Sequence, residues 1–123
     1  RRVARPPAAP DSQSAVAARK RSEATIAACS LPTDALQAWL TGDDIERPKP
    51  DPEIYTKTVA ALGIPAGRCV AIEDSIAGVA SAKSAGMKCV AVTNTFPAEQ
   101  FRNADSVVKS LEEVNVESLR SML

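Results

Sequence analysis

The sequence predicts an α/β fold built on a parallel sheet, and three observations favour it. Short, almost continuously apolar runs recur from residue 30 onward, several are followed by segments with helical spacing of apolar residues, and glycine or proline separates them. Continuous apolar runs are typical of strands buried on both faces, and their alternation with helices is typical of βαβ units. With 123 residues, of which 45% are hydrophobic, the chain can form the core of one small domain.

Residues 1–29 differ in composition from the rest of the chain. Prolines in residues 1–13 disfavour a helix or a central strand, whereas residues 14–29 are rich in alanine and have helix propensity without a broad apolar face. We therefore expect a basic Ala/Arg/Pro-rich arm over residues 1–29, disordered and then helical, and a folded domain over residues 30–123. The alternatives for this arm are an organelle transit peptide and a nucleic-acid-binding arm, but it lacks a dense basic run and interleaved aromatic residues.

The folded domain begins with a short apolar strand at residues 36–40, which ends in a Gly-Asp-Asp turn. A helix follows, with Asp51 as its N-cap and Pro52 in the first helical position. Gly63 ends this helix, because glycine readily adopts the left-handed conformation at a helix C-terminus. The later elements continue the alternation: strand 68–72, helix 75–85, strand 88–92, strand 106–108, and a closing helix marked by a capping box of Ser110 and Glu113.

The composition excludes several classes of site and partner. The sequence has no histidine, which excludes a Ser-His-Asp triad, a Cys-His pair and a histidine zinc site. The formal net charge is zero and no window contains the roughly 18 apolar residues of a membrane span, so we expect neither nucleic acid nor a membrane as partner. The three cysteines form no CxxC pair, which favours reduced thiols and a cytoplasmic location, with organelle targeting by the basic arm as the alternative.

Two acids directly follow a predicted strand. Glu73 and Asp74 come at the carboxyl end of strand 69–72, where open parallel sheets bind ligands because loops and helix N-termini converge there. Adjacent carboxylates repel each other unless a cation lies close by, and hard oxygen ligands suit Mg²⁺. The pair predicts a metal site; the alternative is a turn whose acids only cap the helix that starts near Ser75.

Lys49 lies between Pro48 and Pro50, which stiffen its backbone. An ammonium held at a fixed point can neutralise a phosphoryl group and a nearby carboxylate together. Taken alone, Lys49 could also be an exposed loop residue. Because Lys49 and the acid pair fall at corresponding ends of one βαβ unit, the combination predicts a shared site for a phosphoryl group and Mg²⁺.

The segment GDDIERPKPDPEIY, followed by LGIP and RCVAIEDSIAGVASAKSAGMKCVAVTN, resembles the C-terminal half of the core domain of haloacid dehalogenase-like (HAD) hydrolases. The resemblance covers about residues 31–115 and is to the β-phosphoglucomutase and phosphoglycolate phosphatase-like subgroup. It implies a partial Rossmann-like parallel sheet with flanking helices. It also implies that Lys49 steadies the nucleophile and the phosphoryl group. Glu73 and Asp74 would bind Mg²⁺, with Ser75 supporting their loop.

The sequence departs from the family pattern in its first part. Family members attack phosphorus with an aspartate from a DxDGT motif, and no DxDxT or DxDxV occurs here. Ser14 lies at about the spacing of the second-motif hydroxyl, and the helical cap domain of the subgroup is missing. In the family the nucleophile strand lies beside the strand that ends in the acid pair. Strand 69–72 would therefore have a free edge, open to association with another polypeptide.

From these features we expect a magnesium-dependent phosphatase or phosphomutase for small phosphate esters of the sugar-phosphate class. We expect it here as a truncated form without the aspartate nucleophile, inactive by itself, whose ligand is a small phosphorylated metabolite. Two alternatives stay open: a non-catalytic interaction protein or regulatory fragment derived from the same fold, and a receiver-like phospho-acceptor module. The lysine of receivers follows the last strand, whereas Lys49 precedes the acid pair.

Overall fold

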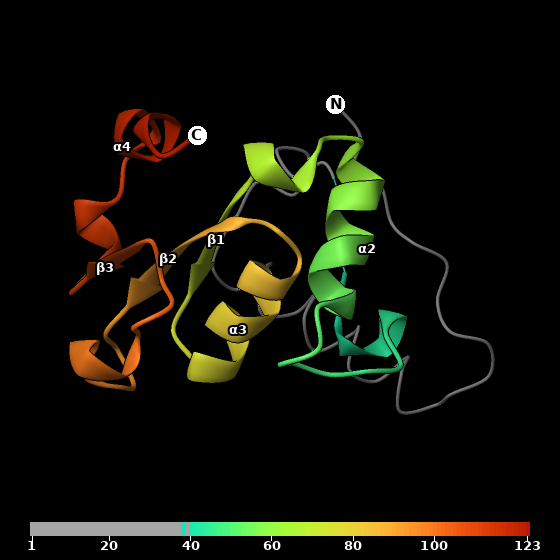
Figure 1. Cartoon of the computed structure of the whole chain (residues 1–123), viewed down its shortest axis with the longest axis horizontal. Helices are drawn as coiled ribbons and strands as arrows, with labels where there is room; N and C mark the ends of the chain where they lie inside the picture. The colour runs from blue at the N-terminus through green and yellow to red at the C-terminus, as the bar shows by residue number, and fades with distance from the viewer. Residues whose placement is uncertain (1–37, 39) are drawn as a thin grey trace, which may run out of the picture.

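The computed structural model describes Ala38 and residues 40–123. This part contains a three-stranded parallel sheet in the order β1-β2-β3 (Figure 1). The strands are β1 at Val70–Glu73, β2 at Lys88–Val92 and β3 at Ser106–Val108. The predicted fold class, a partial Rossmann-like α/β sheet with flanking helices, is confirmed.

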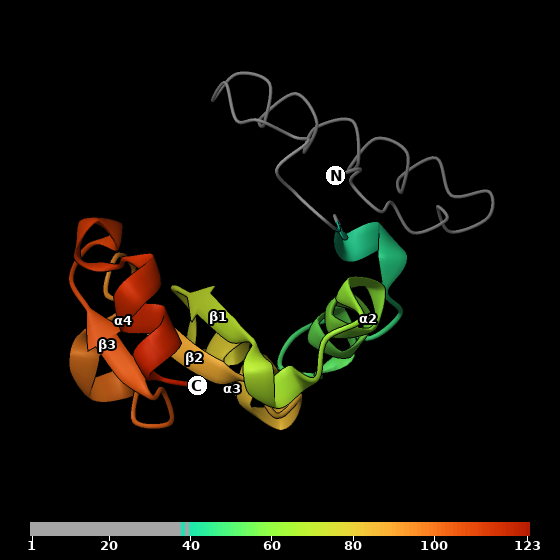
Figure 2. The ribbon, with the colours of Figure 1, turned by 90° about the horizontal axis from the view of Figure 1, so that it is seen from above.

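Three α-helices accompany the described sheet: α2 at Glu53–Leu62, α3 at Ile76–Ser84 and α4 at Val116–Ser121. Helix α3 packs against β1, β2 and α2. In both ribbon views α2 lies beyond β1 and α4 lies near β3, so these two helices are at opposite ends of the described part (Figure 1, Figure 2). No helix among the described residues is long and apolar enough to cross a membrane.

The core lies between α3 and the sheet. Ala71 on β1 is paired with Cys89 on β2, and both belong to one buried cluster with Val79 and Ala82 of α3. Small side chains at this face let the helix approach the sheet closely. In contrast, Ile72 of β1 is 43% exposed. Within the described residues β1 has a strand neighbour on one side only, namely β2.

Local sequence signals set the ends of α2, the helix next to Lys49. Gly63 adopts φ 69° and ends the helix, as predicted. The N-cap position is Pro52 rather than Asp51, so this prediction is wrong by one residue. The Asp51 carboxylate nevertheless contributes at the helix start, because its Oδ1 accepts a hydrogen bond from the Glu53 N–H at 3.0 Å.

Two other predicted boundaries are wrong. The strand predicted at 68–72 is β1, which starts two residues later because Arg68 closes a 3₁₀ turn. The capping box of Ser110 and Glu113 is present, but it caps a 3₁₀ turn only. Helix α4 begins after Asn115, whose side chain accepts a hydrogen bond from the N–H three residues later.

Several predictions concern residues outside the described part. They are the arm at residues 1–29, the suggested role of Ser14, and most of the strand at 36–40. Of that strand the structure describes Ala38, which forms an isolated β-bridge, and Leu40.

Candidate functional site

The site is built around the contact between Lys49 and Glu73. Lys49 lies in the loop before α2, and Glu73 is the last residue of β1. The Lys49 Nζ atom lies 2.5 Å from Glu73 Oε1, and the exposed fractions of the two side chains are 38% and 6%. The contact joins residues 24 positions apart. The structure therefore brings together the predicted lysine and the first predicted acid, with a buried carboxylate against an ammonium that still faces solvent.

Tyr55, in the first turn of α2, belongs to the same cluster and was not predicted from the sequence. Its hydroxyl donates a hydrogen bond to Glu73 Oε1, the oxygen that also contacts Lys49. The Lys49 Nζ lies 5.4 Å from the centroid of the Tyr55 ring, within the range of a cation–π contact. Burial raises the pKa of the phenol, and the hydrogen bond to Glu73 and its charge raise it further. The phenol therefore keeps its proton and acts as a donor.

Gly78 lies against the other oxygen of the Glu73 carboxylate. A Cβ at position 78 would be 1.9 Å from Glu73 Oε2 and 2.2 Å from its Cδ, far inside contact distance. The Gly78 N–H donates a hydrogen bond of 2.9 Å to Ser75 Oγ, which caps α3. Ser75 thus holds the start of α3 at the end of β1, and only glycine leaves room there for the carboxylate.

Asp74, the second predicted acid, has a different environment from Glu73. Its side chain is exposed, and no hydrogen bond or ion pair to its carboxylate is found in the described part of the chain. Nor do residues 40–123 contain a group of three or more Asp, Glu, Cys or His side chains that could hold a metal ion. Mg²⁺ in proteins is often bound by one or two carboxylates and several waters. An exposed Asp74 with no partner among the described residues fits that mode of binding, whereas Glu73 has its oxygens in contact with protein groups.

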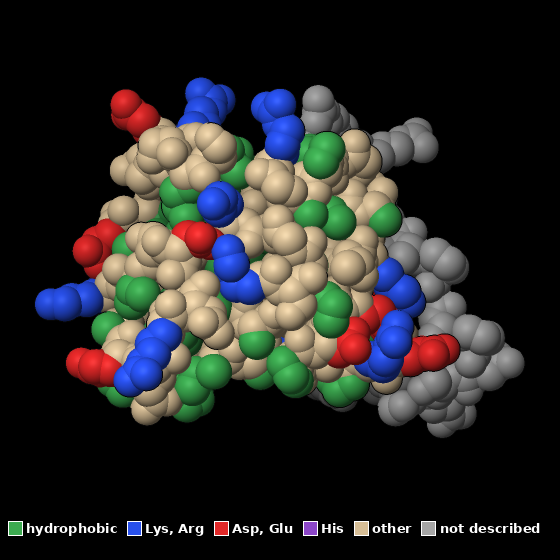
Figure 3. All heavy atoms as spheres, in the orientation of Figure 1, with side chains coloured by type: hydrophobic (Ala, Val, Ile, Leu, Met, Phe, Trp, Pro, Cys, Tyr) green, Lys and Arg blue, Asp and Glu red, His purple; other side chains and the backbone are tan. Residues whose placement is uncertain are grey.

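The loop that carries Lys49 is held by both neighbouring helices. Glu53 of α2 accepts hydrogen bonds at its Oε2 from two loop N–H groups, at 2.5 and 3.3 Å. The buried Ser81 of α3 donates a hydrogen bond of 2.7 Å to the carbonyl oxygen of Asp51. Charged side chains of both signs gather over the segment before α2, where Arg47 Nε lies 3.5 Å from Glu53 Oε1 (Figure 3). Neither Glu53 nor Ser81 was predicted from the sequence as a functional residue, although both fix this loop.

The charges around Glu53 keep its carboxylate ionised. Desolvation raises the pKa of Glu53, but the two backbone hydrogen bonds and the positive charges of Lys57 and Arg47 outweigh it and hold the pKa below its usual value.

The predicted Gly-Asp-Asp turn lies earlier in the chain than Glu53. In this turn Asp44 Oδ2 accepts a hydrogen bond of 2.7 Å from the Thr41 N–H. Asp44 thus takes part in the capping box of a 3₁₀ turn.

Cys89 of β2 is a buried residue of the core. Burial raises the pKa of its thiol to about 11, and the negative charge of Glu73 contributes to this shift. The thiol is therefore protonated at neutral pH, which makes it a poor nucleophile. Among the described residues Cys69 and Cys89 are both free, and reduced thiols stay a prediction.

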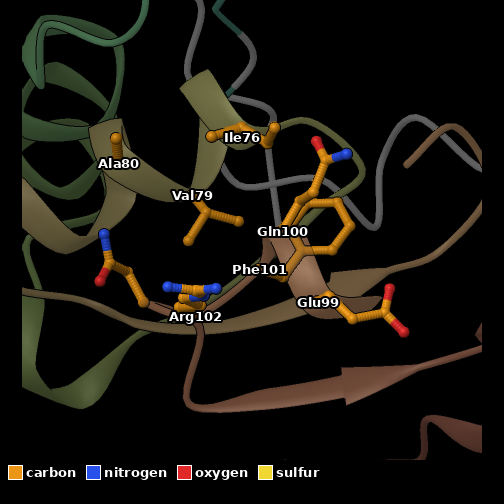
Figure 4. A pocket seen from close by; sticks show the side chains of 8 residues that line it. Ile76, Val79, Ala80, Glu99, Gln100, Phe101 and Arg102 are labelled. Atoms are coloured by element: carbon orange, nitrogen blue, oxygen red, sulfur yellow. The ribbon is translucent and has the colours of Figure 1, made fainter. Parts of the chain in front are cut away.

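A cavity of about 420 Å³ lies between α3 and the 3₁₀ turn Ala98–Gln100 (Figure 4). Ile76 and Val79 line it from α3, and Phe101 and Arg102 line it from the other side. None of the lining residues belongs to the cluster around Glu73. The cavity is therefore separate from the predicted site.

A family model described as haloacid dehalogenase-like hydrolase matches residues 13–92. The chain belongs to this family. The match begins within residues 1–29, the segment predicted as a basic arm, and extends to the end of β2. The family deduced from the motifs around Lys49 and the acid pair is therefore confirmed.

Curated relatives with phosphatase names match about two thirds of the chain. The validoxylamine A 7′-phosphate phosphatase of Streptomyces hygroscopicus subsp. limoneus is 42% identical over 79 residues, which cover 64% of this chain and 37% of that protein. Hexitol phosphatase A of Escherichia coli K12 is 33% identical over 82 residues, which cover 67% of this chain and 38% of that protein. The chain thus spans less than two fifths of the length of either relative.

Solved structures place the chain in the subgroup of phosphatases and phosphoglucomutases. The crystal structure of CbbY from Rhodobacter sphaeroides in complex with phosphate has a TM-score of 0.68 and 31% identity, and the match covers 74% of this chain and 42% of that one. The β-phosphoglucomutase of Clostridium difficile has a TM-score of 0.66 and 28% identity, with 73% and 39% covered.

Proposed function

We propose that this chain supplies one side of a magnesium-dependent phosphoryl-transfer site, in a phosphatase or phosphomutase that acts on small phosphate esters of the sugar-phosphate class. The observation that carries the proposal is the 2.5 Å contact between Lys49 Nζ and Glu73 Oε1 at the carboxyl end of β1. Membership of the HAD-like hydrolases supports it. So do relatives whose names specify a 7′-phosphate or a hexitol, and a related CbbY crystallised with xylulose 1,5-bisphosphate.

Lys49 is suited to stabilise the negative charge of a phosphoryl group. An ammonium has three N–H donors, and the contact with Glu73 Oε1 uses one of them. Because 38% of the Lys49 side chain is exposed, the remaining donors can reach a ligand at the sheet edge. A fixed positive charge at this place would act on the phosphoryl group without reorganisation during the reaction.

Asp74 is the residue that we propose to hold Mg²⁺, with water completing the coordination. Its exposed carboxylate lies at the same strand end as Glu73 and has no partner among the described residues. When bound, Mg²⁺ would offset negative charge on the phosphoryl oxygens. Glu73 would instead orient Lys49, because its Oε1 atom already accepts two donors.

The family nucleophile is absent from the 123-residue sequence, which contains no DxDxT motif. A complete reaction would need an aspartate from beyond these residues. We propose that it comes from a strand beside β1, whose second edge has no strand neighbour within the described residues. We therefore expect binding of Mg²⁺ and phosphate by this chain, but no hydrolysis.

Calorimetric titration with inorganic phosphate in the presence of Mg²⁺ tests the proposal. The wild-type chain should bind phosphate, Lys49→Met should abolish binding, and Lys109→Met, at an exposed lysine outside the cluster, should leave it unchanged. Turnover of p-nitrophenyl phosphate by the chain alone should be undetectable. Absence of phosphate binding by the wild type, or equal binding by the two lysine variants, would refute the half-site.

A non-catalytic interaction protein is the second candidate. The free edge of β1 within the described residues and the 43% exposure of Ile72 favour it, because unpaired strand edges template association. This candidate predicts self-association or partner binding that Ile72→Lys weakens, with no Mg²⁺ or phosphate binding. Sedimentation analysis of the wild type and Ile72→Lys measures self-association. Together with the phosphate titration, it separates the two candidate functions.

The subcellular location of the protein is a related proposal. A cytoplasmic location stays the prediction, with organelle targeting as the alternative. The alternative gains support from an Arabidopsis relative, the chloroplastic protein SUPPRESSOR OF QUENCHING 1, which is 35% identical over 86 residues and matches 70% of this chain. Those residues cover 8% of that protein.

A further inference from the structure

One carboxylate oxygen receives two donors from separate parts of the fold. Glu73 Oε1 accepts from the Lys49 ammonium, which comes from the loop before α2, and from the Tyr55 hydroxyl, which comes from α2 itself. The same Tyr55 ring lies 5.4 Å from the ammonium. Tyr55 therefore touches both members of the ion pair, the anion through its hydroxyl and the cation through its ring face.

The Glu73 carboxylate cannot easily turn away from these donors. Its side chain is 6% exposed, and a Cβ added to residue 78 would lie 1.9 Å from its Oε2 atom. The carboxylate is thus confined between Tyr55 of α2 and Gly78 of α3. Its orientation sets the direction in which the Lys49 ammonium is held.

Tyrosine at position 55 provides a hydrogen-bond donor that phenylalanine would lack. Both rings would fill the same space, where Tyr55 packs against the buried core cluster. Only the hydroxyl supplies a second donor to Glu73, and hydrogen bonds to charged groups are short and directional. Without it the carboxylate would be held by the ammonium alone, and the two could move together.

We propose that Tyr55 is a positioning residue for Lys49, which it fixes by binding the Glu73 carboxylate with its hydroxyl and the ammonium with its ring. This inference rests on the proposed function, because Lys49 is taken to hold the phosphoryl group. Tyr55 acts on the ligand only through Glu73 and Lys49.

Binding of inorganic phosphate in the presence of Mg²⁺ tests the functional part. Tyr55→Phe keeps the ring and should weaken phosphate binding by about fivefold, the effect of one ordinary hydrogen bond. The matched control is Thr58→Val on the same helix. The hydroxyl that it removes donates a hydrogen bond of 2.6 Å to the Ile54 carbonyl and, among the described residues, reaches no group of the cluster. The control should bind phosphate as the wild type does.

A spectroscopic titration tests the contact itself. Tyr55 is the single tyrosine of the chain, so the ultraviolet change on phenol ionisation reports it alone. The wild-type phenol should stay un-ionised at a pH where free tyrosine, with a pKa of about 10, is mostly ionised. Glu73→Gln should lower the midpoint, because it removes both the acceptor charge and the ionic hydrogen bond. A purely packing role for Tyr55 would leave the midpoint unchanged by this variant.

The outcomes separate the inference from the function on which it rests. Equal phosphate affinity of Tyr55→Phe and wild type, or an unchanged midpoint in Glu73→Gln, overturns the positioning role and leaves the proposed function intact. Absence of phosphate binding by the wild type overturns the proposed function, and the positioning role with it. The inference is supported if Tyr55→Phe binds phosphate more weakly than Thr58→Val does and Glu73→Gln lowers the titration midpoint of the phenol.

Discussion

Ser81, buried in α3, donates a hydrogen bond of 2.7 Å to the carbonyl oxygen of Asp51, two residues after Lys49. The two residues are 30 positions apart. Helix α3 begins at Ile76, directly after the acid pair and its N-cap Ser75, so this bond ties the helix that follows Glu73 and Asp74 to the loop that carries the lysine. The relative placement of the lysine and the acids therefore depends on a contact outside the cluster itself.

Ser81→Ala should destabilise the fold by about 1–2 kcal/mol, because it leaves the Asp51 carbonyl without its donor. Urea unfolding followed by far-ultraviolet circular dichroism measures the loss. Ser84→Ala is the matched control, since Ser84 lies on the same helix and is exposed. The control should change stability by no more than about 0.5 kcal/mol. Equal effects of the two substitutions would show that the buried hydrogen bond contributes nothing.

Gly78→Ala should be among the most damaging single-methyl changes in the described part. The added Cβ would fall 1.9 Å from Glu73 Oε2, and this carboxylate is 6% exposed and held at its other oxygen by Lys49 and Tyr55. We expect a loss of about 1–3 kcal/mol from overpacking, measured by urea unfolding. Gly67→Ala is the control, because a Cβ at position 67 would meet nothing within 4 Å. A wild-type midpoint for Gly78→Ala would mean that the Glu73 carboxylate moves aside at little cost.

The sequence predicted the local features of this site better than its tertiary contacts. Gly63 ends α2 and Ser75 starts α3 as their types suggest, because capping depends on residues within one helical turn. Tyr55 was missed because a tyrosine at helical spacing is typical of a core stripe. Its phenol meets Glu73, 18 positions away, only when α2 and β1 are packed together.

The closing helix shows how two similar local signals compete. Both Ser110 and Asn115 head a capping box, and the closing helix was predicted from the first. The first box caps only a 3₁₀ turn because Val114 adopts an extended conformation, with φ −99° and ψ 129°, which stops the helix. Nothing within residues 110–113 signals that interruption, so tertiary context decides where α4 begins.

Asp105 should make stability depend on acidic pH. Its Oδ2 accepts hydrogen bonds of 2.8 Å from Lys83 Nζ and from the Cys89 N–H. The bond from Lys83 is the main reason that the pKa of Asp105 lies below its usual value, and burial opposes it. A carboxyl group with a lowered folded-state pKa stabilises the fold above its unfolded pKa, about 3.9, and this contribution is lost as the pH falls through the folded pKa.

Asp105→Asn should therefore be less stable than wild type at pH 7 and should lose less stability when the pH is lowered below about 4. Thermal unfolding across this range measures both effects. The exposed Glu117 of α4 provides the control, and Glu117→Gln should follow the wild-type curve. Parallel curves for Asp105→Asn and wild type would contradict the stabilising role of the Lys83 contact.

The two adjacent acids should separate in their effects on metal and on phosphate. Glu73 holds the ammonium and the phenol at its Oε1, whereas the exposed Asp74 has no partner among the described residues. Asp74→Asn should weaken Mg²⁺ binding by more than about tenfold, because removing a direct ligand should cost at least as much as mutating a group that only orients one. Glu73→Gln should weaken Mg²⁺ binding less but should reduce phosphate binding more, because it frees Lys49 from its orientation. Calorimetric titrations of both variants with Mg²⁺ alone, and then with phosphate, measure this crossed pattern.

An equal loss of Mg²⁺ binding in both variants would instead mean that both carboxylates hold the cation. In that case Glu73 would have to give up its contact with Lys49 whenever the metal binds.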